Sequence, residues 1–133
     1  MNTRTIKIIY WSLFSLFAAA MFMDGIGGVT RAEEGKVVMH HLGYPEYVLS
    51  IFGIAKFFGV AAILQNKYQT IREWAYAGFA INFVGATASR AYAGDSLALI
   101  IPPVIALAFM LVVYFLGKKV AQLKAERQVQ LSF

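Results

Sequence analysis

Hydrophobic residues gather in four stretches along the chain, separated by polar segments. The stretches cover residues 6–23, 46–64, 73–91 and 97–116. A helix needs about 20 apolar residues to cross the hydrocarbon layer of a bilayer, and each stretch is close to that length. The pattern therefore predicts an all-α protein, a bundle of four transmembrane helices.

The first stretch has two explanations. Basic residues precede it and it contains the small-residue run Ala18-Ala19-Ala20, features that also suit a cleaved signal peptide. The apolar character continues through Met21-Phe22-Met23, and a retained helix gives the better distribution of charge described below. We therefore expect residues 6–23 to form the first span.

The connection between the first and second spans is the longest, and we expect a short amphipathic helix within it. The run Gly25–Gly28 predicts a flexible exit from the first span. Thr30 and Glu33 have the spacing of a capping box. Apolar positions between Val37 and Leu42 then form one stripe, and the Gly43–Pro45 turn ends the helix. This helix would lie against the bundle or the membrane interface.

The composition also belongs to the membrane class. Hydrophobic residues make up 59% of the 133 residues and charged residues 14%, whereas a soluble domain has about 45–50% and about 25%. This length suits one membrane domain, which we expect to cover residues 1–133. The chain has no cysteine, which excludes disulfides and thiol chemistry. A redox role would need a bound cofactor or a partner protein.

The basic residues are distributed unequally between the two sides of the four-span model. One side holds eight of them: Arg4, Lys7, Lys67, Arg72, Lys118, Lys119, Lys124 and Arg127. The other side holds three, Arg31, Lys36 and Arg90, together with the acids Asp24, Glu33, Glu34, Glu46 and Asp95. The positive-inside rule places both termini in the cytoplasm, with residues 117–133 as a basic tail. Because these residues flank apolar spans and form no basic domain, we expect no nucleic-acid partner.

Lys56, near the middle of the second span, is the first candidate for function. A charged group at that depth is costly and suggests a functional site. Asn82 lies equally far into the antiparallel third span. A lysine beside an amide would bind a carbonyl, a carboxylate or a quinone oxygen. In the alternative interpretation, Lys56 is a structural residue that pairs with an acid or extends to the interface.

Further ligand-binding candidates lie near the outer ends of the spans. Asp24, Arg90 and Asp95 would either form an ion-pair cluster that holds three helices together or line the mouth of a pocket. Tyr44, in the turn before the second span, completes the candidate set.

The remaining charged residues have simpler explanations. Glu46 and Glu73 stand in the first turns of their predicted helices, where a carboxylate stabilises the positive end of the helix dipole. His40 and His41 are adjacent, so on a helix they point about 100° apart. They would not hold one metal ion together, and we predict no metal site.

Three ordered motifs resemble the DoxX-like family of small bacterial membrane proteins. They are HLGYP at 41–45, GIAKFFG at 53–59 and REWAYAGF at 72–79, followed by Gly85-Ala86 and Gly94-Asp95. The resemblance covers about residues 40–105 and implies a four-helix membrane fold. The family is named for a subunit associated with a thiosulfate:quinone oxidoreductase, and relatives are linked to redox-stress complexes.

Two features limit what the resemblance implies about chemistry. The family usually has Ser-His near the end of its third span, whereas this chain has Ser89-Arg90. A proton-transfer or metal role of that histidine therefore does not carry over. The four-helix plan is also similar to vitamin K epoxide reductase, but that chemistry needs cysteines.

The leading hypothesis is an accessory or ligand-binding subunit in the bacterial cytoplasmic (inner) membrane. It would bind a quinone or another lipophilic molecule non-covalently near Lys56 and Asn82, and would serve a redox or detoxification partner protein.

Two alternatives belong to other classes. A small membrane enzyme would act on a hydrophobic substrate with Lys56, Asp24, Arg90 or Asp95 as acid or base. An oligomeric transporter of small solutes would present small residues of the third span, such as Gly78 and Ala86, to other copies of the chain.

Overall fold

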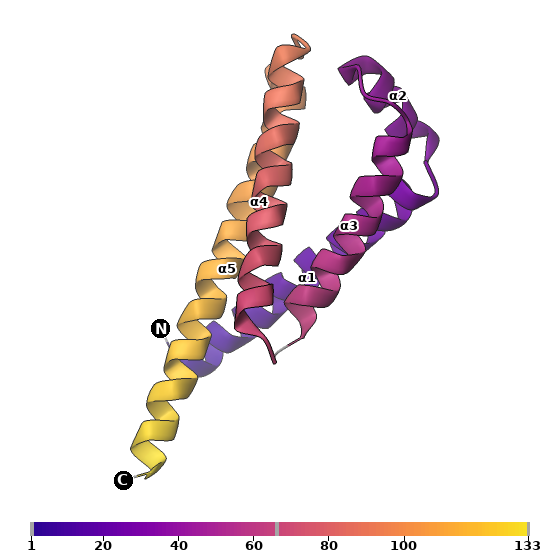
Figure 1. Ribbon diagram of the computed structural model, residues 1–133. Helices are drawn as coiled ribbons and strands as arrows, with labels where there is room; N and C mark the ends of the chain where they lie inside the picture. The colour runs from indigo at the N-terminus through magenta and orange to yellow at the C-terminus, as the bar shows by residue number, and fades with distance from the viewer. Residues whose placement is uncertain (1, 66, 133) are drawn as a thin grey trace.

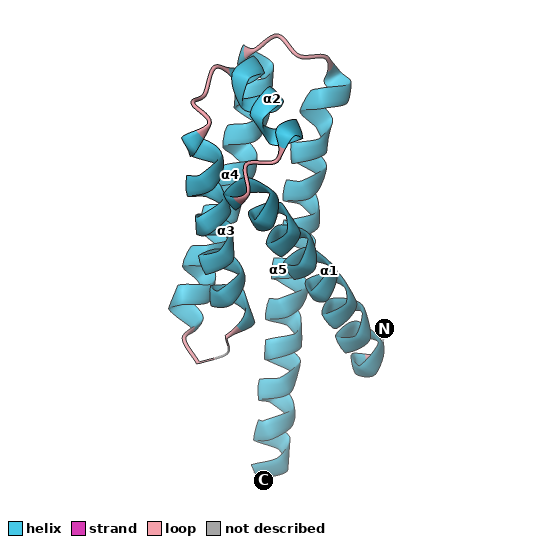
Figure 2. Cartoon of the chain, turned by 90° about the vertical axis from the view of Figure 1, so that its right-hand side faces the viewer, coloured by secondary structure: helices cyan, strands magenta, loops and turns pink. Residues whose placement is uncertain are grey.

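The computed structural model describes residues 2–65 and 67–132, which form five helices joined by short connections (Figure 1). The helices are α1 (Thr3–Val29), α2 (Glu33–Leu42), α3 (Tyr47–Leu64), α4 (Gln69–Tyr92) and α5 (Leu97–Ser132). Figure 2 shows no strand in the described part of the chain. The predicted all-α class is confirmed.

The four long helices run alternately up and down the molecule. α1 packs against α3 and α5, and α4 packs against the same two helices. Both described chain ends and the α3–α4 connection lie toward one end, called here the termini end (Figure 1). α2 and the α4–α5 connection lie toward the opposite end, called the α2 end. The α1–α3 pair and the α4–α5 pair lean apart toward the α2 end (Figure 1).

Aromatic side chains dominate the core in which the four long helices meet. On α1, buried residues recur at Tyr10, Phe14, Phe17 and Met21, a spacing that places them on one face of the helix. The Phe17 ring packs edge-on against Phe79 of α4, with the ring centroids 5.4 Å apart. The other buried hydrophobic residues are Ala18, Val60, Ile63, Tyr76, Phe83, Met110 and Val113.

Three helices, α1, α3 and α5, are long and apolar enough to cross a membrane. Much of their apolar surface is exposed, as expected of helices that face lipid. α4 has 24 residues, so its length of about 36 Å would also span a bilayer. It is more polar because it contains Arg72, Glu73, Asn82 and Arg90.

The predicted flexible exit at Gly25–Gly28 is wrong, because α1 continues through this run to Val29. The glycines instead let α1 approach α3. A Cβ atom added to Gly53 would lie 2.7 Å from the Val29 nitrogen and 2.8 Å from the Gly25 oxygen. A Cβ on Gly28 would lie 2.6 Å from the Leu49 oxygen. The two backbones are therefore in contact, and only glycine fits.

The short helix between the first two spans is present as α2, and it packs against α3. Its predicted capping box is wrong. Ala32 occupies the N-cap without a side-chain hydrogen bond, because Thr30 is used to end α1. The Thr30 hydroxyl donates to the Ile26 carbonyl oxygen at 2.8 Å. Gly43 ends α2 in the left-handed conformation, with φ at 84°.

α5 is longer than the predicted last span, because the basic tail continues the same helix to Ser132. Pro102 and Pro103 both lie within it. Pro102 also lines an apolar groove of about 450 Å³ between α1 and α5. The other lining residues are Leu16, Phe17, Ala20, Met21, Ile105, Ala106 and Phe109.

The substitution Gly53→Ala tests the α1–α3 contact. The added methyl group meets backbone atoms of α1, which cannot rotate away, so we expect a loss of about 1–3 kcal/mol in stability. Thermal unfolding in detergent, followed by helical circular dichroism, measures it. Gly78→Ala is the matched control because its Cβ would meet open space. An equal effect of both substitutions would contradict the packing role.

Candidate functional site

The lysine in the middle of the second span forms an ion pair between two helices. Lys56 is the tenth of the 18 residues of α3, and its Nζ donates to Oδ2 of Asp24 on α1. The Lys56 side chain is 17% exposed and the Asp24 side chain 57%. The glycines of the α1–α3 contact are close to this pair in the sequence, because Gly25 follows Asp24 and Gly53 stands three residues before Lys56. The arrangement matches the interpretation in which an acid pairs with Lys56.

Asn82 lies at the same level of the bundle as Lys56. Gly59 of α3 packs against Phe79 of α4, since a Cβ on Gly59 would lie 2.7 Å from the Phe79 ring. Lys56 and Asn82 each stand three residues from this contact toward the α2 end. A helix rises 1.5 Å per residue, so both are about 4.5 Å beyond it. Both residues are partly buried.

A second polar cluster joins the helices at the α2 end. The Asp95 carboxylate accepts hydrogen bonds from the His41 ring and, at 3.1 Å, from Nη1 of Arg90. Its side chain is only 4% exposed. The hydroxyl oxygens of Tyr44 and Ser89 are 2.7 Å apart. We call these five residues the α2-end tie, because they connect α2 and the following turn to the end of α4.

The structure divides the predicted outer acid–base group into two parts. Arg90 and Asp95 pair as expected. Asp24 pairs with Lys56 instead of joining them. His41, which carried no predicted contact of this kind, completes the pair at the α2 end. None of the candidate residues lines the apolar groove between α1 and α5.

The hydrogen bond from His41 lowers the pKa of Asp95, and the bond from Arg90 lowers it further. Partial burial opposes this shift by disfavouring the charged form. The two donors outweigh burial, so Asp95 remains an anion at pH values at which an ordinary aspartic acid would begin to take up a proton.

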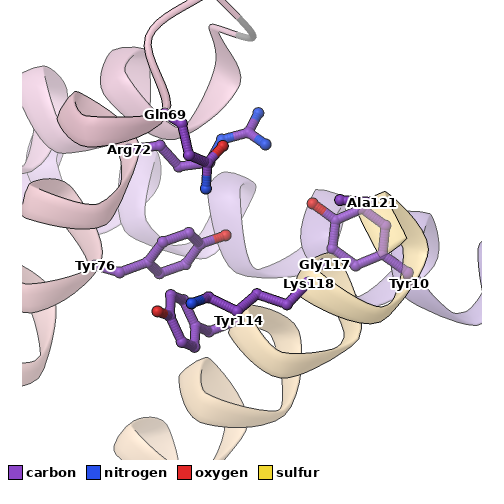
Figure 3. A pocket seen from close by; sticks show the side chains of 8 residues that line it. All are labelled: Tyr10, Gln69, Arg72, Tyr76, Tyr114, Gly117, Lys118 and Ala121. Atoms are coloured by element: carbon purple, nitrogen blue, oxygen red, sulfur yellow. The ribbon is translucent and has the colours of Figure 1, made fainter. Parts of the chain in front are cut away.

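A pocket of about 230 Å³ opens at the termini end, where α1, α4 and α5 meet (Figure 3). We call it the tyrosine pocket. Its lining residues are Tyr10, Gln69, Arg72, Tyr76, Tyr114, Gly117, Lys118 and Ala121. The Tyr10 ring lies against Gly117, at which an added Cβ would stand 3.0 Å from the ring. Tyr10 and Tyr76 are 4% and 5% exposed.

Hydrogen bonds between helices hold the walls of this pocket. Glu73 accepts a hydrogen bond from the Tyr114 hydroxyl at 2.5 Å, and its other oxygen lies 3.5 Å from Nζ of Lys118. Arg72 donates to the carbonyl oxygens of Ile63 and Gln65 at 2.9 and 3.0 Å. Glu73 therefore joins α4 to α5. The first-turn role predicted for it is wrong, because α4 begins at Gln69 and its first turn contains no acidic residue.

Sequence reasoning missed the tyrosine pocket. Tyr10, Tyr76 and Tyr114 all lie within predicted apolar spans, where nothing marked them as functional. The available signal was that all three tyrosines stand near the cytoplasmic ends of their predicted spans, beside Arg72 and Lys118. In the described part of the chain, no group of three or more His, Asp or Glu residues could hold a metal ion.

Comparison with models of known protein families gives one match. A family model described as the DoxX-like family matches residues 12–115. The chain belongs to the DoxX-like family. The resemblance indicated by the sequence motifs is therefore confirmed, and together with the apolar helices it identifies a membrane protein. Searches of curated proteins and of solved structures found no significant match.

The ion pair of this DoxX-like protein predicts non-additive mutant effects. Lys56→Met leaves the Asp24 carboxylate without its partner, and we expect a loss of about 1–3 kcal/mol in stability. The double variant Lys56→Met/Asp24→Leu removes both charges and should lose less than the two single variants summed. Thermal unfolding in detergent measures the stability of all four proteins of this double-mutant cycle. Lys67→Met, in the exposed loop, is the control. Strict additivity would show that the pair contributes no coupling.

Asp95 predicts loss of stability in acid. Because its pKa is lowered in the folded protein, its contribution is complete above the ordinary carboxyl pKa of about 3.9. It is lost as the pH falls through the lowered value. We therefore expect wild type to exceed Asp95→Asn in melting temperature near neutral pH, with the difference closing only in strong acid. A difference that disappeared near pH 6 would assign the effect to another group.

Proposed function

We propose that all four long helices span the bacterial cytoplasmic (inner) membrane, with both termini in the cytoplasm. α3 and α5 both run from the α2 end to the termini end, and α4 is the segment that returns the chain between them. If α3 and α5 cross the bilayer, α4 crosses it too. The termini end then faces the cytoplasm, which agrees with the excess of basic residues on that side.

Within that membrane, the protein acts as an accessory subunit that binds a quinone or a similar lipophilic molecule. The observation that carries this proposal is the Lys56–Asp24 ion pair. Two charges in membrane-spanning helices are costly, and a structural pair would be expected to close on itself. Here the Asp24 side chain stays more than half exposed. The pair therefore lies open to the space beside the helices.

The chemistry of Lys56 suits an oxygen-bearing ligand. An ammonium group has three N–H donors, and Asp24 Oδ2 accepts one of them. A quinone carbonyl would accept another, and the amide of Asn82 stands at the same level on α4. The apolar surfaces of α1, α3 and α4 would surround the rest of the molecule. Because the chain has no cysteine, electrons would pass between the quinone and a redox partner protein.

The alternatives have less support. An enzyme would need acids and bases that converge on one cavity. Here the candidates form two separate ion pairs, Lys56 with Asp24 and Arg90 with Asp95. An oligomeric transporter would present the small-residue face of α4 to other copies. Gly78 does face open space, but Asn82 and Ala86 are partly buried.

The test is the quinone content of the protein after gentle extraction from its native membrane, measured by native mass spectrometry and by solvent extraction. We expect wild type to retain quinone and Asn82→Ala to retain severalfold less. The double variant Lys56→Met/Asp24→Leu, which leaves no unpaired charge, should retain almost none. Lys67→Met should match wild type.

Equal quinone retention by wild type and the folded double variant would refute the proposal. Helical circular dichroism and gel filtration identify a variant that has simply unfolded. A wild-type protein that stays folded and carries no quinone would also count against it, and would support a purely structural role for the ion pair.

A further inference from the structure

We infer that the tyrosine pocket binds a phosphate group, presented at the cytoplasmic edge of the membrane by an anionic lipid. The inference rests on the proposed orientation, in which the termini end faces the cytoplasm, but not on the proposed quinone site. The pocket lies at the termini end and shares no residue with the Lys56–Asp24 pair. Four observations support it: two buried phenols, a set of donors, an excess of positive charge and the size of the pocket.

Two phenol hydroxyls carry the argument. Tyr10 and Tyr76 are almost completely buried, yet neither hydroxyl forms a hydrogen bond to another described residue. Although the two rings are buried, the hydroxyl oxygens are not enclosed by the protein. They therefore face the pocket as donors that no described residue uses. Figure 3 shows both hydroxyls turned toward the space that the side chains enclose. A ligand oxygen placed there would give both groups an acceptor.

The other polar lining groups are also donors. The amide of Gln69 points into the same space (Figure 3), and Arg72 and Lys118 add two positive charges. The nearest acid, Glu73, does not line the pocket. It accepts hydrogen bonds from the Tyr114 hydroxyl and, at 3.3 Å, from Nε2 of Gln69, and it lies 3.5 Å from Nζ of Lys118. The second N–H of the Gln69 amide is left for a ligand. Two cations and one carboxylate leave one excess positive charge. This donor-rich, positive site matches an oxyanion, and phosphate oxygens accept such charge-assisted bonds well.

The size and location of the tyrosine pocket favour a lipid head group as its ligand. The volume of about 230 Å³ is below the roughly 300–1,000 Å³ of pockets for drug-sized ligands. It therefore fits a compact polar group and not a whole amphipathic molecule. Basic pockets between membrane helices on the cytoplasmic side bind anionic head groups in other proteins. The lining residues Tyr10, Gly117, Lys118 and Ala121 lie outside the family-matched segment 12–115.

The experiment measures lipid binding by the full chain, delipidated in a neutral detergent and titrated with phosphatidylglycerol or with phosphatidylcholine. Native mass spectrometry gives the bound fractions. A hydrogen bond to a charged group corresponds to roughly tenfold in affinity. We therefore expect Tyr76→Phe to weaken phosphatidylglycerol binding about tenfold, and Tyr10→Phe/Tyr76→Phe to weaken it further. Phosphatidylcholine should bind more weakly to wild type because its choline group is positive.

The phenylalanine variants keep the rings that pack in the core, so folding should be retained. Tyr92→Phe is the matched control, since Tyr92 is 93% exposed at the other end of α4. Quinone retention should be unchanged in all of these variants, which separates this test from that of the proposed function.

A second arm distinguishes the source of the phosphate. Inorganic phosphate is added to the delipidated protein and the melting temperature is recorded. No shift, combined with tight phosphatidylglycerol binding, assigns the pocket to a lipid head group. A shift that Tyr10→Phe/Tyr76→Phe abolishes assigns it to free phosphate. The inference is overturned if the double variant binds phosphatidylglycerol as tightly as wild type, or if Tyr92→Phe causes the same loss.

Discussion

The backbone contact between α1 and α3 is the constraint on which the half of the molecule toward the α2 end depends. Gly25 and Gly28 of α1 meet Gly53 of α3 at distances that leave no room for a Cβ atom. Inside a bilayer, lipid is as apolar as leucine, so helices associate through close packing and polar contacts and not through the hydrophobic effect. Glycine provides the close packing here, and it brings α3 near enough for Lys56 to reach Asp24.

Polar contacts supply the rest of the association, at both ends of the molecule and between α1 and α3. The α2-end tie joins His41 and Tyr44 to α4 and to the turn that follows it. At the opposite end, Glu73 joins α4 to α5. The two helix pairs lean apart between these positions (Figure 1). On the α1–α3 side, Lys56 pairs with Asp24, and Nε of Arg31, just after α1, donates to the Ser50 hydroxyl at 2.9 Å. The mutual pairing of Lys56 and Asp24 explains how two charges are tolerated among apolar helices.

The sequence was sufficient to predict the helices but not their partners. The apolar stretches predicted the four long helices, and Gly43 predicted the end of α2, where it adopts the left-handed conformation. The glycine run before Val29 was misinterpreted because glycine serves both flexible loops and close helix contacts, and only the position of α3 decides between them. Likewise, the sequence offered two possible ion-pair partners for Asp24, namely Lys56 and Arg90. The choice between them depends on helix rotation, which one sequence does not specify.

Arginine stands at position 90, where the resemblance to the family would lead us to expect a histidine. A histidine there would have an ordinary pKa of about 6.5 and could exchange a proton at neutral pH. An arginine stays charged throughout that range, and Arg90 uses its charge to hold Asp95. The carboxylate is consequently fixed as an anion, with His41 on its other oxygen. This end of the DoxX-like protein is therefore built to hold helices together, and a proton-transfer role at position 90 is incompatible with its chemistry.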